Sequence, residues 1–142
     1  MITVESILMA KGPDVIVAAP DNTVEDAAKL MSQANVGSVI VKDGNAVAGV
    51  FTERDVLSRV IAKGRDPKVV SLVDVMSSPV RSCGLNDSAA SCAEIFKQEH
   101  IRRLVVIEEG ALIGVIGIRD VMYAELSANA ERIKELEKML SE

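Results

Sequence analysis

Aromatic residues are scarce in this sequence, and basic residues are not in excess. The 142 residues include two Phe, one Tyr and no Trp. Proteins that bind single-stranded nucleic acids stack bases on aromatic side chains, so the composition disfavours that class. Duplex binding needs a basic face, whereas here 16 basic side chains stand against 21 acidic ones. We therefore expect no nucleic acid partner.

Cysteine and long apolar runs are also limited. Cys83 and Cys92 have no Cys or His neighbour at the spacing of metal ligands, so we expect reduced, packed thiols and no metal site. The longest uncharged apolar stretch, residues 111–118, is far below the ~20 residues that span a bilayer. No basic start followed by an apolar run and a cleavage site opens the sequence. These features predict a cytoplasmic protein with no membrane partner.

Catalytic and phosphate-loop motifs are missing too. The single histidine, His100, has no Ser or Cys nucleophile in a motif that supports one. Neither a Walker-type loop nor a Gly-x-Gly-x-x-Gly sequence after a strand occurs. The NTPase and Rossmann dehydrogenase classes are therefore disfavoured, and we expect no enzyme activity.

What the sequence does contain is an internal repeat. A shift of 65 residues aligns residues 46–50 with 111–115 and residues 54–56 with 119–121, and the register continues over residues 15–61. Most aligned pairs agree in polarity rather than identity. An apolar lead-in that contains a Met precedes each copy, and the first copy has two more residues near Lys11. The pattern predicts a duplicated unit of about 60 residues.

Each copy switches periodicity in the same order, which predicts a strand, a helix, two strands and a second helix. In the first copy these elements are expected at 15–17, from 23, at 36–41, at 47–51 and at 53–63. In the second copy they are expected at 80–82, from 88, at 101–107, at 112–116 and from 119. Thr23, with Asp26 three residues later, and Ser88 are placed to cap the first helix of each copy.

A three-stranded sheet with helices on one face leaves its other face apolar, so the two copies should pack sheet against sheet with pseudo-twofold symmetry. The predicted fold class is α+β, with β-α-β-β-α units at 1–66 and 67–127 and a C-terminal amphipathic helix at 128–142. Ile133, Leu136 and Leu140 form an apolar stripe on that helix. The helix either docks on its own domain or joins two chains.

A polar cluster recurs where the third strand of each copy meets the second helix. Thr52 and Asp55 stand there in the first copy, and Gly117 and Asp120 in the second. Such a helix start accepts a phosphate, and a carboxylate one turn further can accept hydrogen bonds from the vicinal hydroxyls of a ribose. Thr52 and Asp55 are equally typical of a capping box that needs no ligand. Acid–base catalysis by Asp55 and Asp120 is disfavoured because the duplication separates them.

The repeated order of these motifs resembles a tandem pair of cystathionine-β-synthase (CBS) domains, the Bateman module. The resemblance rests on the Met-containing lead-ins, Val-Gly-Ser-Val-Ile-Val, Ile-Arg-Arg-Leu-Val-Val and Gly-Val-Phe-Thr-Glu-Arg-Asp-Val, and covers Thr3 to about Leu126. It implies a stand-alone regulatory protein that binds AMP, ADP or ATP, or in some members NAD or S-adenosylmethionine, without catalysis. We expect a homodimer with an unidentified protein partner. The rival interpretation is a ligand-free structural or protein-interaction module.

The resemblance also implies two clefts, each shared between the copies. It suggests that Thr52 contacts a phosphate or ribose oxygen and that Asp55 contacts the ribose hydroxyls. The implied first cleft comprises Thr52, Arg54, Asp55, Val80, Arg81, Ser82, Ile101, Arg102 and Arg103. The implied second cleft comprises Asp14, Val15, Ile16, Val36, Gly37, Ser38, Arg119 and Asp120. Gly117 replaces the Thr there, and Gly37 and Ser38 replace the arginines, so we expect unequal sites with poorer phosphate recognition in the second.

Overall fold

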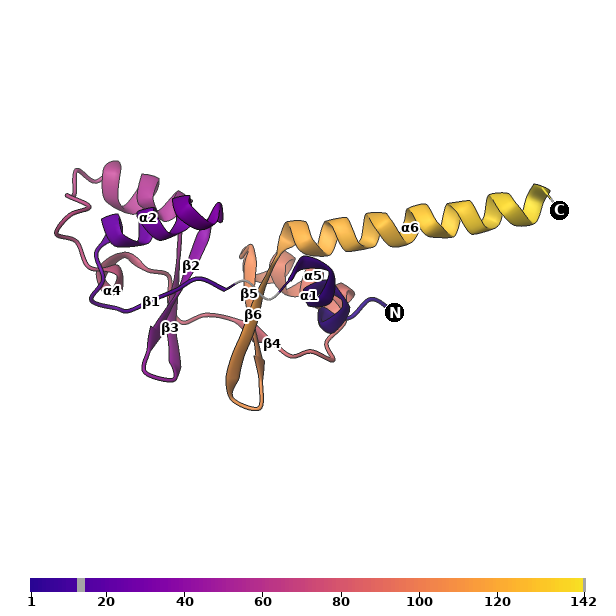
Figure 1. Cartoon of the computed structure of the whole chain (residues 1–142), viewed down its shortest axis with the longest axis horizontal. Helices are drawn as coiled ribbons and strands as arrows, with labels where there is room; N and C mark the ends of the chain where they lie inside the picture. Colours follow the sequence, from indigo (N-terminus) through magenta and orange to yellow (C-terminus); the bar gives the residue numbers. More distant parts are fainter. Residues whose placement is uncertain (13–14, 142) are drawn as a thin grey trace. The chain divides into compact units, whose positions relative to one another are not determined.

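The computed structural model describes residues 1–12 and 15–141 and divides into two compact units (Figure 1). The first-repeat unit is Asp14–Val80, and the second-repeat unit combines Met1–Pro13 with Arg81–Glu142. The chain's first segment therefore belongs with the second repeat. The boundaries at 1–66, 67–127 and 128–142 follow the repeat in the sequence and remain a prediction.

The first-repeat unit is a three-stranded sheet with helices on one face. Its sheet has the order β1-β2-β3, with β1 parallel to β2 and β2 antiparallel to β3. The elements are β1 (Val17–Ala18), α2 (Val24–Ala34), β2 (Ser38–Asp43), β3 (Ala46–Thr52), α3 (Glu53–Asp55), the π-helix η1 (Val56–Ile61) and α4 (Leu72–Val75). Side chains of α2, η1 and α4 pack with those of β2 and β3 in one hydrophobic cluster.

The second-repeat unit repeats this topology. Its sheet has the order β4-β5-β6 with the same parallel and antiparallel pairings. The elements are α1 (Val4–Lys11), β4 (Ser82–Cys83), α5 (Ala89–Glu99), β5 (Arg103–Glu108), β6 (Ala111–Gly117) and α6 (Ile118–Ser141). The predicted α+β class, with two three-stranded units and a C-terminal helix, is confirmed. Packing of one sheet on the other stays a prediction.

Local signals place the first helix of each repeat where the sequence predicts it. Thr23 accepts a hydrogen bond from the amide of Asp26, and the Asp26 carboxylate accepts one from the amide of Thr23, so α2 begins with a capping box. Ser88 accepts from the Ser91 amide at the start of α5. Asn35 and His100 end the two helices in the left-handed conformation, each with φ of 55°. His100 is thus a helix cap.

Each unit is completed by the lead-in that precedes the other repeat. In the second-repeat unit, the Val4 amide donates to Asp87 O at 2.9 Å, and the Ala89 amide donates to Ile2 O at 2.9 Å. In the first-repeat unit, the Leu72 amide donates to Asn22 O at 2.9 Å. The buried side chains of α1 and α4 then enter the two hydrophobic clusters. Both lead-ins therefore bind the start of a repeat that is not the one they precede.

Two helices differ from the sequence prediction. The helix expected at 53–63 begins as α3 but continues as a π-helix, in which the Ala62 amide donates to Leu57 O and the Arg65 amide to Val60 O. Gly64, which directly follows the predicted helix range and is expected to stop it, has a φ of 68°. The helix expected from 119 and the separate one expected from 128 are a single helix, α6, of 24 residues (Figure 1). Ser127 and Asn129 lower helix propensity without ending the helix.

Candidate functional site

The start of α3 in the first-repeat unit is a closed capping box. Asp55 Oδ2 accepts a hydrogen bond from the Thr52 amide at 3.0 Å, and Thr52 Oγ1 accepts one from the Asp55 amide at 3.2 Å. The next amide, that of Glu53, donates to Gly37 O at 3.0 Å. The capping interpretation of Thr52 and Asp55 is therefore confirmed. It leaves the Thr52 hydroxyl hydrogen and further carboxylate lone pairs for a ligand.

Arg59 connects this carboxylate to the lead-in. Its Nε lies 3.5 Å from Asp55 Oδ1, and its Nη1 donates to the carbonyl oxygens of Val75 and Met76 at 3.1 Å each. The Asp55 side chain is only 12% exposed, so this is a largely buried carboxylate facing a cation. The arrangement compensates the carboxylate's charge and holds the end of α4 against the same helix.

The equivalent helix start in the second-repeat unit keeps only half of the box. The Gly117 amide donates to Asp120 Oδ2 at 2.7 Å, and the Ile118 amide donates to Arg102 O at 2.9 Å. Gly117 has no hydroxyl to return a bond to the Asp120 amide. In its place, Lys11 Nζ lies 2.9 Å from Asp120 Oδ2 and donates to Val115 O at 2.7 Å.

In both units the aspartate at the helix start is paired with a basic side chain, but the basic residue differs. In both units a cation faces the helix-start carboxylate and also binds backbone carbonyls that hold the lead-in in place. In the first-repeat unit the cation is Arg59, which stands on the helix; in the second it is Lys11, which stands on the lead-in. The position equivalent to Arg59 is Ala124. Lys11 binds the same oxygen that caps the helix, so both contacts fall on Asp120 Oδ2, whereas at Asp55 the amide and the cation contact different oxygens.

The other residues predicted for the first cleft lie on both units. Arg54 is exposed on α3, and Val80 is half-buried at the end of its unit. In the second-repeat unit, Arg81 Nε lies 2.8 Å from Glu99 Oε2, so its guanidinium already has an acidic partner. Of the remaining four, Ser82 begins β4 and Arg103 begins β5. Half-buried Ile101 and exposed Arg102 come just before β5, and Arg102 O accepts from the Ile118 amide at the start of α6.

The residues predicted for the second cleft are distributed similarly. Asp14 lies outside the described residues. Val15 and Ile16 are half-buried before β1, and Ile16 O accepts from the Ile40 amide at 2.8 Å. Half-buried Val36 and Gly37 precede Ser38, the first residue of β2. On the second-repeat unit, Arg119 is exposed on α6 and Asp120 is half-buried. The predicted cooperation of these residues with those of the other unit remains a prediction.

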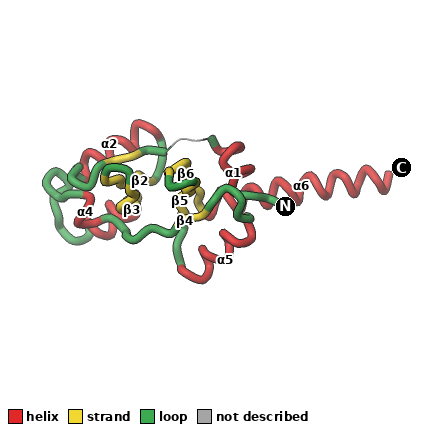
Figure 2. The backbone as a smooth tube through the Cα atoms, turned by 90° about the horizontal axis from the view of Figure 1, so that it is seen from below, coloured by secondary structure: helices red, strands yellow, loops and turns green. Residues whose placement is uncertain are grey.

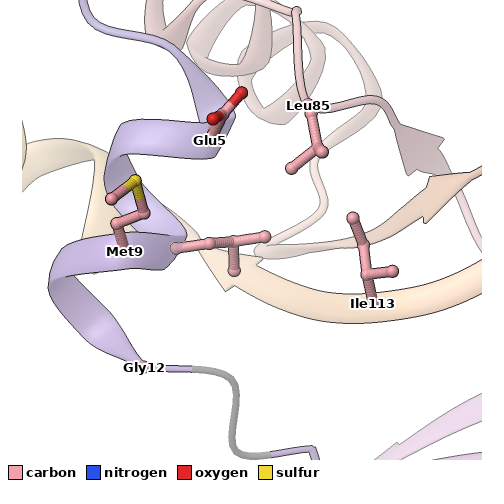
Figure 3. A pocket seen from close by; sticks show the side chains of 6 residues that line it. Glu5, Met9, Gly12, Leu85 and Ile113 are labelled. Carbon is pink, nitrogen blue, oxygen red and sulfur yellow. The ribbon is translucent and has the colours of Figure 1, made fainter.

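Each unit has a surface hollow, and only that of the first-repeat unit is lined by residues next to its helix start. In the first-repeat unit a hollow of about 520 Å³ lies between α2 and α3 and is lined by Ala28, Met31, Ser32, Asn35, Val36, Gly37, Glu53 and Val56. In the second-repeat unit a hollow of about 290 Å³ lies beside α1 (Figure 3). Figure 3 shows Glu5 and Met9 on α1, with Leu85 and Ile113 across the hollow. The first hollow is the more polar and directly adjoins the residues that flank Asp55.

Sequence reasoning missed Arg59 and Lys11. A helical i,i+4 spacing relates Asp55 to Arg59, so the pair was open to prediction once the helix was assigned. Lys11 and Asp120 are 109 residues apart, and only the exchange of lead-ins brings them together. The two extra residues near Lys11 distinguish the first lead-in from the second in the sequence. They do not by themselves indicate a contact with Asp120, because that contact depends on the tertiary fold.

The described residues offer neither a metal cluster nor a membrane span. Among them no group of three or more His, Cys, Asp or Glu side chains is arranged to hold a metal ion. No described helix combines the length and apolarity that crossing a membrane requires. Burial raises the pKa of the Cys83 thiol to about 12 and also raises the pKa of Cys92, and both cysteines are free and buried. The expectation of reduced, packed thiols is confirmed in this structure.

The site and fold together define a duplicated α+β module in which each unit carries a capped, cation-paired aspartate at a helix start. The CBS domain family matches residues 4–62 and 72–127. The chain is 32% identical over 113 residues to the CBS domain-containing protein YhcV of Bacillus subtilis, covering 80% of each chain. This protein belongs to the CBS domain family and contains the domain twice.

Solved structures support the same assignment. A putative signal-transduction protein with CBS domains from Burkholderia ambifaria has a TM-score of 0.83 at 31% identity, covering 88% of this chain and 94% of that one. A hexameric CBS-CP12 protein from bloom-forming cyanobacteria has a TM-score of 0.78 at 28% identity, covering 87% and 72%. The CBS pair predicted from the motifs is thereby confirmed.

Proposed function

We propose that this protein is a regulatory module that binds an adenosine-containing nucleotide, AMP, ADP or ATP, and catalyses no reaction. CBS domain pairs are generally regulatory ligand-binding modules. The observation that carries the proposal is the Asp55 carboxylate, which is 12% exposed and held by the Thr52 amide and by Arg59. A carboxylate oriented in this way is prepared to accept two vicinal hydroxyls without further ordering.

The chemistry of Thr52 and Asp55 suits a nucleoside phosphate. Thr52 Oγ1 accepts from the Asp55 amide, so its hydrogen can be donated to a phosphate or ribose oxygen. Asp55 Oδ1 and Oδ2 retain lone pairs beyond those used by Thr52 and Arg59, and ribose hydroxyls can donate to them. Exposed Arg54 adds a positive charge beside this helix start.

We further propose that the Asp120 site is the weaker of the two. Gly117 supplies no hydroxyl for a phosphate, and Asp120 Oδ2 already accepts from the Gly117 amide and from Lys11. A nucleotide there must either use Asp120 Oδ1 or displace Lys11 from Oδ2. Binding at the Asp55 site is therefore expected to occur at lower concentrations.

Occupancy would be passed on through contacts of the protein surface with a partner protein, in a cytoplasmic homodimer. A nucleotide can bias such contacts only by binding two states of the module unequally, with a coupling of typically 1–3 kcal/mol. NAD and S-adenosylmethionine carry the same adenosine group and are alternative ligands at the same residues.

Calorimetric titration with AMP, ATP, NAD and S-adenosylmethionine tests the proposal. We expect Asp55→Asn to weaken binding of the preferred ligand by about tenfold or more, because two hydroxyl bonds to a charged acceptor are lost. Asp120→Asn should affect only the weaker site. Asp26→Asn is the matched control, because Asp26 closes the same kind of capping box at α2 without belonging to the site.

Two results contradict the proposal. One is the absence of heat with all four nucleotides in folded, ligand-free protein. The other is tight binding that Asp55→Asn leaves unchanged. Circular dichroism of each variant separates lost binding from lost folding.

The second candidate function is a ligand-free interaction module. It is favoured by one observation, that both helix-start carboxylates already have a backbone amide and a cation as partners within the chain. On this interpretation Thr52 and Asp55 serve the fold alone, and the protein works through its surface. The first of the two contradicting results above would select it.

A further inference from the structure

Most of α6 has no partner within its own unit. The helix is buried against the unit at Val121, and Ala124 packs partly against the same core. From residue 125 onward its residues are exposed except for half-buried Ala128. Figures 1 and 2 show the helix continuing well past α1 and α5 of its unit. Large apolar side chains are exposed along it, with Leu126 at 57%, Ile133 at 55% and Leu136 at 44%.

Five exposed apolar residues of α6, together with Asn129, follow a heptad pattern. Successive spacings of four, three, four, three and four separate Met122, Leu126, Asn129, Ile133, Leu136 and Leu140. This alternation of four and three is the spacing of a heptad repeat, and it keeps the stripe on one narrow seam of the helix. A seam of this width is typical of a two-stranded coiled coil rather than of a helix that covers a globular core. Because these side chains are exposed in their own unit, the structure does not support docking of this part of α6 on its own domain.

The charges beside the seam select a parallel partner. Arg132 precedes Ile133 at a g position, and Glu137 follows Leu136 at an e position. In a parallel, in-register pair, g of one helix meets the next e of the other, so Arg132 meets Glu137 of the second copy twice by symmetry. The antiparallel pairing with the longest overlap instead sets Arg132 beside Arg132 of the second copy. Within its own helix Arg132 has only an exposed contact with Glu135 at 4.0 Å.

Asn129 adds a constraint on register. It is the one polar residue in the seam between Met122 and Leu140. In a parallel pair without a shift, the two Asn129 amides face each other and can satisfy each other's hydrogen bonds. A shift by one heptad sets each amide against an apolar layer, where it has no partner.

We propose that residues 122–140 of α6 pair with the same residues of a second copy as a parallel, in-register coiled coil. The pairing covers the apolar seam, joins Arg132 to Glu137 across the interface twice, and aligns the two Asn129 side chains. It concerns a surface separate from Thr52 and Asp55 and does not depend on nucleotide binding.

Disulfide trapping in the full chain tests the orientation. Asn129→Cys sets two sulfurs against each other only in the parallel, in-register pair, whereas antiparallel pairing sets residue 129 against residue 133 or 140. Glu131→Cys, on the outer face of the helix, is the matched control. Native Cys83 and Cys92 do not interfere because they are buried. Rapid dimer formation by Asn129→Cys alone supports the proposal; equal rates for the two variants, or no crosslink with Asn129→Cys, would overturn it.

Charge-reversal variants, with the dimer Kd measured by sedimentation equilibrium, give a second test. Arg132→Glu and Glu137→Arg each create two repulsive contacts, so each should raise the dimer Kd by about threefold or more. The double variant should return the Kd to about that of the native chain. Failure of the double variant to recover, with both single variants folded, contradicts the parallel pairing.

The apolar seam is tested in the same experiment. Ile133→Ser with Leu136→Ser removes two exposed side chains and should shift the chain towards monomer without changing its melting temperature. Val69→Ser, which removes an apolar side chain that is 72% exposed in the first-repeat unit, is the matched control. An unchanged mass for the seam variant at all concentrations overturns the proposal.

Discussion

The contact between each lead-in and its sheet predicts that two equivalent glycines differ sharply in their tolerance of alanine. Gly49 on β3 and Gly114 on β6 are 65 residues apart and occupy the same place in their repeats. A methyl group at Gly49 would lie 2.5 Å from Met76 Sδ and 2.9 Å from Ser77 O. A methyl group at Gly114 would lie nearest to the Leu8 side chain, at 2.8 Å from Cδ2 and 3.2 Å from Cδ1.

The magnitude follows from what each neighbour can do. Leu8 can turn away, whereas Ser77 O accepts from the Val50 amide at 3.0 Å and Ser77 donates back to Val50 O at 2.9 Å, so it can move only by breaking that bridge. Overpacking costs about 1–3 kcal/mol, and weakening two hydrogen bonds adds about 1 kcal/mol. Loss of glycine's freedom in the unfolded chain returns about 0.4–1 kcal/mol. We expect Gly49→Ala to lower the free energy of unfolding by about 1–3 kcal/mol and Gly114→Ala by less than about 1 kcal/mol.

Urea unfolding followed by far-ultraviolet circular dichroism measures the difference. Second-site variants separate a clash with a side chain from a clash with the backbone. Leu8→Ala should remove most of the stability loss caused by Gly114→Ala. Met76→Ala should leave much of the stability loss caused by Gly49→Ala in place. Equal stability losses for the two glycines, or full relief of Gly49→Ala by Met76→Ala, would refute the reasoning that Ser77 O is the fixed obstacle.

Three further predictions concern stability and reactivity. Arg59→Ala should lower the melting temperature, with a loss of about 1 kcal/mol, because two carbonyl contacts of a half-exposed guanidinium disappear; an unchanged melting curve argues against its linking role. A hydrogen bond from the Thr23 amide lowers the pKa of Asp26. The ionised Asp26 carboxylate therefore stabilises the folded state above the usual pKa of 3.8, and this stabilisation is lost as the pH falls through the lower native pKa. Acid titration of Asp26→Asn should therefore show a smaller loss of stability below about pH 4 than the native chain. Because burial raises the pKa of Cys83 to about 12 and raises that of Cys92 as well, a thiol reagent at mildly alkaline pH should label both only after urea is added; rapid labelling of folded protein contradicts this.

Much of the fold was open to prediction because its signals are local. The repeat, the apolar strands and the capping pair of Thr23 and Asp26 all lie within short windows of sequence, and the strands form within a few residues of the expected ranges. The π-helix and the continuity of α6 were not predicted. Both depend on how the chain packs after a correct helix start, and Ser127 and Asn129 weaken a helix locally without stopping it.

The candidate site was predicted in part, for the same reason. Thr52 and Asp55 form the motif that spacing indicates, and the absence of a hydroxyl at Gly117 is visible in the sequence. The cation that faces each carboxylate was not found. Arg59 lay within reach of a helical-spacing argument, whereas Lys11 meets Asp120 through a tertiary contact that no local pattern encodes.

The exchange of lead-ins has a consequence for the order in which the chain can fold during synthesis. The first-repeat unit is one continuous segment and can close as soon as Val80 has left the ribosome. By contrast, α1 is made before that unit, but the carbonyl groups of Leu85 and Asp87 that accept from its first amides come much later, and Lys11 and Val115 are separated by 104 residues. The apolar side chains of Val4 and Ile7 on α1 therefore stay without their packing partners while the whole first-repeat unit is synthesised. The sheet of the second repeat therefore binds a helix that was made before the first repeat.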